Sequence, residues 1–117
     1  MANRFEDHCP KIINGDIPAV IVEQTETALA FCDINPQAKT HVLIIPKTHI
    51  ESTRDLNGEN IHCLSEMAGM ANKIAKSEGI SESGYRWVIN TGDDGGQTVH
   101  HLHLHLLGGR QLQWPPG

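Results

Sequence analysis

The hydrophobic pattern of the first half of the chain predicts strands followed by one helix. Short apolar runs at 20–22 and 27–33 are typical of strands, and the nearly continuous run at 40–46 is typical of a strand with both faces covered. From 57 to 78 the apolar residues recur at three- and four-residue steps, which predicts one buried stripe on a helix. The residues of that stripe are Ile61, Leu64, Ala68, Ala71, Ile74 and Ala75. Asn57 is placed to cap this helix.

The second half of the chain predicts two more strands separated by a polar loop. The run 85–89 predicts a strand with Trp87 in the core, and 91–97 is a loop rich in glycine and aspartate. The run 99–107 predicts the last strand, which ends at Gly108. Because strands precede a single helix in the sequence and two more strands follow it, the pattern indicates an α+β fold around a mainly antiparallel sheet.

Length and composition fit a single domain over 1–117. A chain of 117 residues is long enough to bury one core. Its 38% hydrophobic and 20% charged residues are typical of a globular protein and exclude a disordered chain. We expect 1–10 to form a loose N-terminal arm and 108–117 to form a C-terminal tail.

Charge and cysteine content narrow the partners and the compartment. The net charge of -5 argues against nucleic acid as a partner, since that partner requires a basic surface. No run approaches the ~18 apolar residues of a membrane span, so we expect no membrane association. Three widely spaced cysteines, Cys9, Cys32 and Cys63, make a poor disulfide framework. A reducing cytoplasm is therefore the expected location.

Histidines alternate with leucines in the last predicted strand. Because side chains alternate between the two faces of a strand, His101, His103 and His105 are predicted to line one face at spacings of roughly 6–7 Å. Leu102 and Leu104 then point to the other face and into the core. The arrangement concentrates three imidazoles on one surface.

Three interpretations of this run compete. It is a solvated strand face that happens to be rich in histidine, a metal site, or a site of nucleophilic and acid–base chemistry. The glycine-rich loop just before it favours the third, because Gly95 and Gly96 allow backbone N–H groups to turn toward a bound anion. In that case a neutral imidazole attacks phosphorus, and a backbone carbonyl holds the proton on its other nitrogen.

Several segments together resemble the histidine triad (HIT) family. The run His101-Leu102-His103-Leu104-His105-Leu106-Leu107 is similar to the family's pattern of histidines alternating with apolar residues. The segments 31–38, 40–49 and 90–99 also resemble the family, and the tail with Trp114-Pro115-Pro116-Gly117 resembles its Hint branch. The resemblance extends over about 10–117.

The resemblance implies a fold and an activity. The fold is a HIT-like five-stranded antiparallel sheet with one main helix and a short one, and the sheets of two subunits join in a homodimer. The activity is that of a purine nucleoside phosphoramidase, which hydrolyses the P–N bond of AMP– or GMP–amine conjugates through a nucleotidyl-histidine intermediate. No cofactor or metal is expected. A dinucleoside polyphosphate hydrolase, a nucleotidyl transferase of the same superfamily, and a non-catalytic nucleotide- or metal-binding regulatory module remain alternatives.

The resemblance also implies roles for the histidines. It makes His103 the nucleophile, His105 a phosphate contact and His101 an orienting residue. His41 matches a further histidine behind the triad, and Thr98 is, with a histidine, a candidate proton donor to the leaving amine.

The resemblance further implies a set of nucleotide contacts. The residues expected to bind the nucleotide are Ile17, Phe31, Asp33, Ile34, Asn90, Gly96, Gln97, Thr98, Val99, His103 and His105. Within this set Asp33 matches the carboxylate that binds ribose, which suits two hydroxyls because a carboxylate accepts several hydrogen bonds. Trp114 is expected to contact the partner subunit.

The chain departs from the family pattern at three places. Cys32 stands where the nucleotide pocket often has histidine, and His100 stands where tyrosine is common. Some relatives hold a structural zinc through an N-terminal Cys-x-x-Cys pair, which this chain lacks. His8 or Cys9 together with His49 leaves a partial zinc site as an open alternative.

Overall fold

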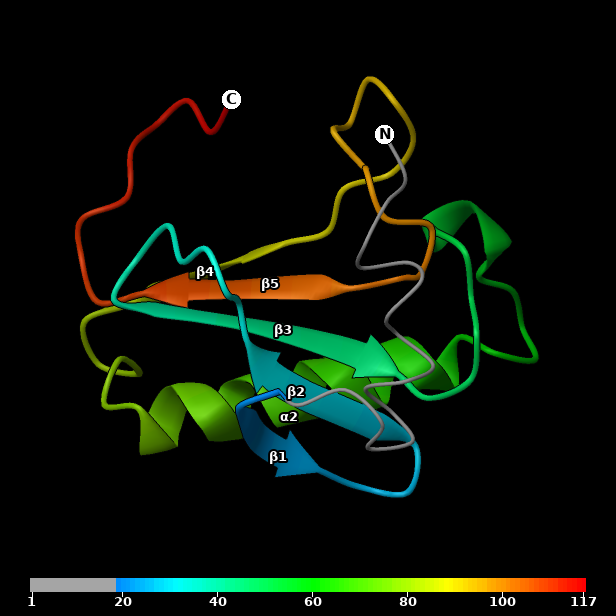
Figure 1. Cartoon of the computed structure of the whole chain (residues 1–117), viewed down its shortest axis with the longest axis horizontal. Helices are drawn as coiled ribbons and strands as arrows, with labels where there is room; N and C mark the ends of the chain where they lie inside the picture. Colours follow the sequence, from blue (N-terminus) through cyan, green and yellow to red (C-terminus); the bar gives the residue numbers. More distant parts are fainter. Residues whose placement is uncertain (1–18) are drawn as a thin grey trace.

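The computed structural model describes residues 19–117, and a five-stranded antiparallel sheet lies at its centre (Figure 1). In the order in which they lie side by side, the strands are β1 (Ile21–Gln24), β2 (Ala28–Cys32), β3 (Thr40–Pro46), β5 (Leu104–Gly108) and β4 (Tyr85–Val88). Every pair of neighbours is antiparallel. The predicted α+β fold is confirmed.

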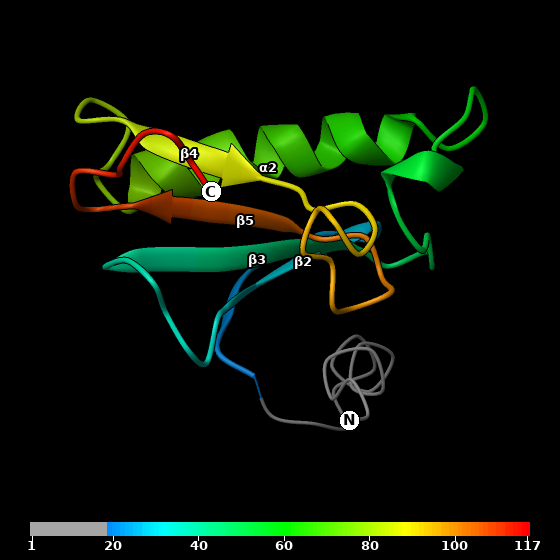
Figure 2. The same ribbon diagram turned by 90° about the horizontal axis from the view of Figure 1, so that it is seen from above.

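One main helix, α2 (His62–Ser77), covers one face of the sheet (Figure 2). It begins later than predicted, because Asn57 accepts hydrogen bonds from the N–H groups of Glu59 and Asn60 and caps a separate turn before it. The buried residues of α2 are Cys63, Met67, Met70, Ala71, Ile74 and Ala75. The predicted stripe was therefore wrong at Ile61, which precedes the helix and is 47% exposed. A short 3₁₀ helix, η1 (Thr53–Asp55), precedes α2.

The two faces of the sheet carry different side chains. Toward α2, alternating residues of the strands join the helix in an apolar core that includes Ala30, Ile44 and Leu104. On the open face, the register places Leu43 of β3 opposite Phe31 of β2 on one side and opposite His105 of β5 on the other. The histidine of β5 therefore lies on the face that the helix leaves uncovered.

The last strand is shorter than predicted. β5 begins at Leu104 and not at 99, so His101 and His103 lie in the segment that leads into the strand. The backbone of that segment bonds to the chain after β3: the N–H of Leu102 donates to the carbonyl oxygen of Ile50 at 2.6 Å. The alternation nevertheless holds, since Leu102 and Leu104 are buried in the core.

The prediction that Trp87 belongs to the core was wrong. It is 41% exposed, because β4 is an edge strand and, among the described residues, has a neighbouring strand on one side only. Between residues 19 and 117, no helix has the length and apolar character needed to cross a bilayer.

Candidate active site

The middle histidine of the run is held by a backbone carbonyl. His103 is buried, and its Nδ1 lies 2.8 Å from the carbonyl oxygen of His101. Because a carbonyl can only accept, Nδ1 carries the proton and Nε2 of the neutral ring holds the lone pair. This is the tautomer and the kind of acceptor that the sequence predicts for a nucleophilic imidazole.

His105 belongs to a chain of hydrogen bonds that begins at the backbone of Gln37. The N–H of Gln37 donates to Nδ1 of His41 at 3.0 Å, so the proton of neutral His41 is on Nε2. That nitrogen lies 2.9 Å from Nδ1 of His105 and donates to it. The proton of neutral His105 is therefore on its Nε2.

This last N–H ends the chain without an acceptor. In the part of the chain that the structure describes, Nε2 of His105 is the buried side-chain polar atom that lacks a hydrogen-bond partner. An unsatisfied buried donor costs about 1–3 kcal/mol. The ring centroids of His103 and His105 lie 5.0 Å apart, so the two imidazoles are neighbours in the site.

His101 belongs to a second chain of hydrogen bonds. Its Nε2 lies 2.9 Å from the carbonyl oxygen of Pro46 and must donate to it. Its Nδ1 then accepts, and the donor is Nδ1 of His49 at 3.0 Å. The sequence offered His49 only as a ligand of a partial zinc site. This contact was missed because nothing in the local pattern indicates a partner 52 residues away.

The surroundings keep these histidines uncharged. Desolvation by burial is the largest cause that lowers the pKa of His103, and it outweighs the opposing effects of the His101 carbonyl and Asp33. Burial, with the neighbouring His103 and His41, lowers the pKa of His105 to about 4. Burial also lowers the pKa of His41 and His101. Neutral rings are the state that nucleophilic attack by imidazole requires.

The glycine-rich loop before the triad is fastened by Gln97. The buried side chain of Gln97 donates to the carbonyl oxygens of Glu51 at 2.8 Å and Val99 at 2.9 Å, and it accepts from the N–H of Gly92 at 3.0 Å. All of these partners are backbone groups of the protein. The amide of Gln97 therefore shapes the loop, and Gly96, at φ 84°, turns within it in a conformation that favours glycine.

The expected ribose ligand Asp33 lies beside the first histidine chain. Its Oδ2 is 3.4 Å from Nε2 of His41, and its Oδ1 accepts from the N–H of Asn35 at 2.8 Å. Phe31 is buried on the same face of the sheet, whereas Ile34 is fully exposed in the turn that follows β2. The structure thus brings Asp33 to the triad and leaves Ile34 on the surface beside it.

The remaining expected contacts lie around the loop and in the tail. Thr98 is exposed, Val99 is buried and Asn90 is half-buried. Trp114 is 79% exposed in the tail. Ile17 lies outside the described residues, and so do His8 and Cys9 of the alternative zinc site.

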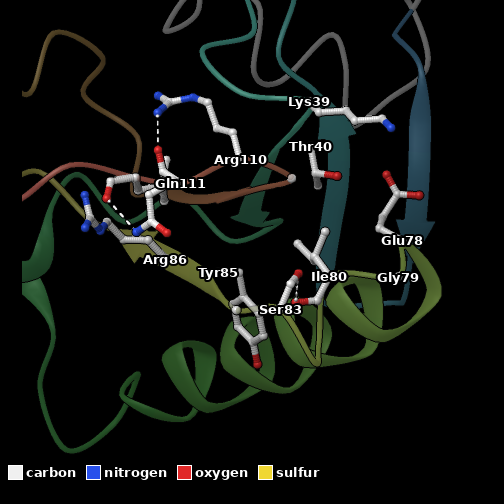
Figure 3. Close-up of a pocket in the computed structure, with 13 residues that line it drawn as sticks. Lys39, Thr40, Glu78, Gly79, Ile80, Ser83, Tyr85, Arg86, Arg110 and Gln111 are labelled. Atoms are coloured by element: carbon white, nitrogen blue, oxygen red, sulfur yellow. Dashed lines mark hydrogen bonds between the residues drawn. The ribbon is translucent and has the colours of Figure 1, made fainter.

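A separate cavity of about 600 Å³ lies at the other end of β3 and β5 (Figure 3). Its described lining contains no histidine and includes Lys39, Tyr85 and Arg110. Lys39 and Arg86 lie on opposite sides of it (Figure 3). The guanidinium group of Arg110 donates to the carbonyl oxygen of Gln37. Its cations do not converge on one point, so we assign the candidate site to the histidines.

Comparison with known proteins identifies the class to which this fold and site belong. Residues 14–112 match the HIT domain family. A HIT family hydrolase from Legionella pneumophila has a similar structure, with a TM-score of 0.90, 53% identity and coverage of 92% of this chain and 96% of that one. The chain therefore belongs to the HIT family, and the resemblance noted from its sequence is confirmed.

Two relatives by sequence give more specific comparisons. The purine nucleoside phosphoramidase of Escherichia coli is 51% identical over 102 residues, which cover 87% of this chain and 86% of that protein. The 14 kDa zinc-binding protein of Zea mays is 51% identical over 109 residues, which cover 92% of this chain and 84% of that protein.

Proposed function

We propose that the protein is a purine nucleoside phosphoramidase, a hydrolase that cleaves the P–N bond of AMP– or GMP–amine conjugates through a nucleotidyl-His103 intermediate. The observation that carries the proposal is the arrangement of protons on the triad. The His101 carbonyl fixes the proton of His103 on Nδ1, and the neighbouring His105 presents an N–H that has no acceptor among the residues that the structure describes. The 51% identity to the E. coli phosphoramidase supports the choice of substrate class.

The first step transfers the nucleotide to the protein. Nε2 of His103 forms a bond to the α-phosphorus, the P–N bond breaks, and the amine leaves with its electron pair and one proton. The His103 ring becomes positively charged in this step, and the hydrogen bond from its Nδ1–H to the His101 carbonyl stabilises that charge. Thr98 and a histidine of the site are the candidate donors of the proton that the amine takes.

Phosphate charge is stabilised by the first histidine chain, which ends at His105. The Nε2–H of His105 donates to a phosphate oxygen and so acquires the acceptor that residues 19–117 do not supply. A positioned donor of this kind strengthens as charge develops in the transition state. Water then attacks phosphorus, the bond to Nε2 of His103 breaks, and the nucleoside monophosphate is released. The proton that the water loses returns to the group that protonated the amine.

A metal-binding module is the second candidate function. Asp33, His41 and His105 place three potential ligand atoms within 4.8 Å of one another, and the maize relative is named a zinc-binding protein. Nε2–H of His41, however, already donates a hydrogen bond to Nδ1 of His105, and the two nitrogens lie 2.9 Å apart. A cation at this place would have to displace that proton, so the hydrogen-bonded state favours the hydrolase.

Turnover of an adenosine phosphoramidate, assayed with and without a chelator, separates these functions. We expect release of AMP and free amine at the same rate in both conditions, because imidazole chemistry of this kind needs no metal. A diadenosine polyphosphate serves as the comparison substrate for the polyphosphate hydrolase alternative. Loss of activity on chelation, with recovery on adding zinc, would contradict the proposal and favour the metal site.

We also propose that the active form is a homodimer. β4 is an edge strand with one unpaired side, and such edges are available for pairing with another chain. Trp114 is exposed beside two prolines, and its large apolar surface gains from contact with a partner subunit. Sedimentation should give a dimer, and deletion of 112–117 should change the preference among amines more than the affinity for AMP. A fully active monomer would contradict the dimer.

A further inference from the structure

The chain immediately after β3 holds the segment that carries the first two triad histidines. Three hydrogen bonds join them: His49 to the ring of His101, the N–H of Leu102 to the carbonyl of Ile50, and the amide of Gln97 to the carbonyl of Glu51. They join consecutive residues 49–51 to the stretch 97–102. We call 49–51 the strap.

His49 is the part of the strap whose side chain acts on a histidine of the triad. Its donation to Nδ1 of His101 leaves the proton of His101 on Nε2, where the Pro46 carbonyl accepts it. Both nitrogens of His101 are thereby used, and the ring is fixed between two sides of the protein. The rings of His49 and His101 lie 4.9 Å apart.

The backbone of His101 in turn holds the ring of His103. Its carbonyl oxygen accepts the Nδ1–H of His103 at 2.8 Å, so the direction of that carbonyl sets the direction of the Nε2 lone pair. A shift of about 1 Å in a reacting group can cost a hundredfold in rate. Fixing the His101 ring therefore matters for a neighbour that the ring itself does not bond.

We infer that His49 is a positioning residue, which acts by donating a hydrogen bond to His101 and so holds the carbonyl that aims His103. The inference rests on the proposed function as far as rate is concerned, but the hydrogen bond itself can be tested without turnover. His49 is an exposed residue, so its replacement leaves no cavity in the core. It does not touch the substrate in this role.

Two variants of His49 distinguish the effect of its hydrogen-bond donor from the effect of its side-chain size. His49→Leu removes the donor, whereas the side-chain amide of His49→Asn offers an N–H near the position of Nδ1. We expect His49→Leu to lower kcat roughly tenfold to a hundredfold with KM little changed, and His49→Asn to recover most of kcat. His62→Leu, at an exposed histidine on α2, is the matched control and should behave as wild type.

Nitrogen-15 NMR of the histidine rings gives the second measurement. Wild type and His49→Asn should show His101 with its proton on Nε2 alone, and His49→Leu should show a mixture of tautomers at His101. Unchanged His101 tautomers and unchanged kcat in His49→Leu would overturn the inference, as would His49→Asn being no better than His49→Leu. If the wild type turns over no phosphoramidate, the proposed function fails, while the NMR result still decides the role of His49.

Discussion

Two pairs of histidines flank His103, and they differ in where their hydrogen bonds end. The pair His49–His101 ends on the carbonyl of Pro46, so each nitrogen of His101 has a partner within the protein. The pair His41–His105 begins at the backbone of Gln37 and ends at an N–H that has no acceptor in the described part of the chain.

The difference distinguishes a pair that fixes the geometry of the site from a pair that can bind a ligand. A pair whose hydrogen bonds all close on the protein fixes geometry and gains nothing from a ligand. A pair that ends on a buried, unsatisfied donor costs about 1–3 kcal/mol until something supplies an acceptor. The substrate phosphate is the acceptor that we propose for His105, and His103 between the two pairs supplies the lone pair.

Loss of the nucleophile should have the largest effect. We expect His103→Ala to lower kcat by several orders of magnitude, since no other group takes its place in the site. AMP should still bind, because the sugar and phosphate contacts remain. Stopped assays of phosphoramidate turnover and calorimetric titration of AMP check the two parts, with His62→Ala as the control. Substantial residual turnover would show that His103 is not the nucleophile.

Loss of the unsatisfied Nε2–H donor of His105 should have the second-largest effect on kcat. We expect His105→Leu to lower kcat about 10²–10³-fold, the range for removing one donor to developing charge. His105→Gln carries an amide N–H that can reach the position of Nε2 and should recover much of the rate. If both variants were equally slow, the shape of the ring and not its proton would be what the site needs.

The Asp33 carboxylate should set a preference for ribose. A carboxylate matched to two hydroxyls loses a hydrogen bond when a 2′-deoxy sugar binds, which costs about 1–3 kcal/mol. Wild type should therefore use ribonucleotide substrates better than deoxyribonucleotide ones, and Asp33→Ala should lose the difference. Comparing the ratio of the two substrates cancels any effect of Asp33 on the nearby His41. Equal use of both sugars by wild type would leave Asp33 as a turn residue only.

Acid pH should have the smallest effect within the usual assay range. Burial lowers the pKa of His103, and the pKa of His105 is lowered to about 4, so both rings stay neutral below the ordinary value of 6.5. At pH 5.5 an ordinary imidazole would be about nine-tenths protonated, whereas the enzyme should keep well over one-tenth of its plateau kcat/KM. A pH profile whose acid midpoint lies at or above 6.5 would contradict the burial of the site.

The same lowered pKa values predict how stability changes with pH. Between 6.5 and about 4 the unfolded chain binds protons that the folded His105 does not, so the free energy of unfolding falls as pH falls through that window. Above pH 6.5 the ring is neutral in both the folded and the unfolded state, so its protonation no longer lowers the free energy of unfolding. Thermal unfolding at several pH values, with His105→Gln for comparison, measures it.

Local pattern was enough to predict the strands, the helix and the core leucines of β5. Alternation along the chain decides which of Leu104 and His105 enters the core, and that is a property of neighbouring residues. The resemblance to the HIT family also assigned Asp33, His41 and His105 to one site, and their potential ligand atoms lie within 4.8 Å of one another.

The features that the sequence did not reveal depend on distant partners. β5 starts late because the strap, about 50 residues earlier, occupies the backbone before it. Trp87 is exposed because the strand order leaves β4 at an edge, which no window around Trp87 contains. The role of Gln97 as a fastener of the loop likewise comes from Glu51, 46 residues away.

The central claim is that His103 forms a covalent bond to the nucleotide. Mass spectrometry of a wild-type reaction with an adenosine phosphoramidate, quenched early and digested, tests it most directly. An AMP adduct on the peptide that carries the triad, assigned by fragmentation to His103, is the predicted result, and it should be absent from His103→Ala. An adduct on His101 or His105 would contradict the assignment of the nucleophile.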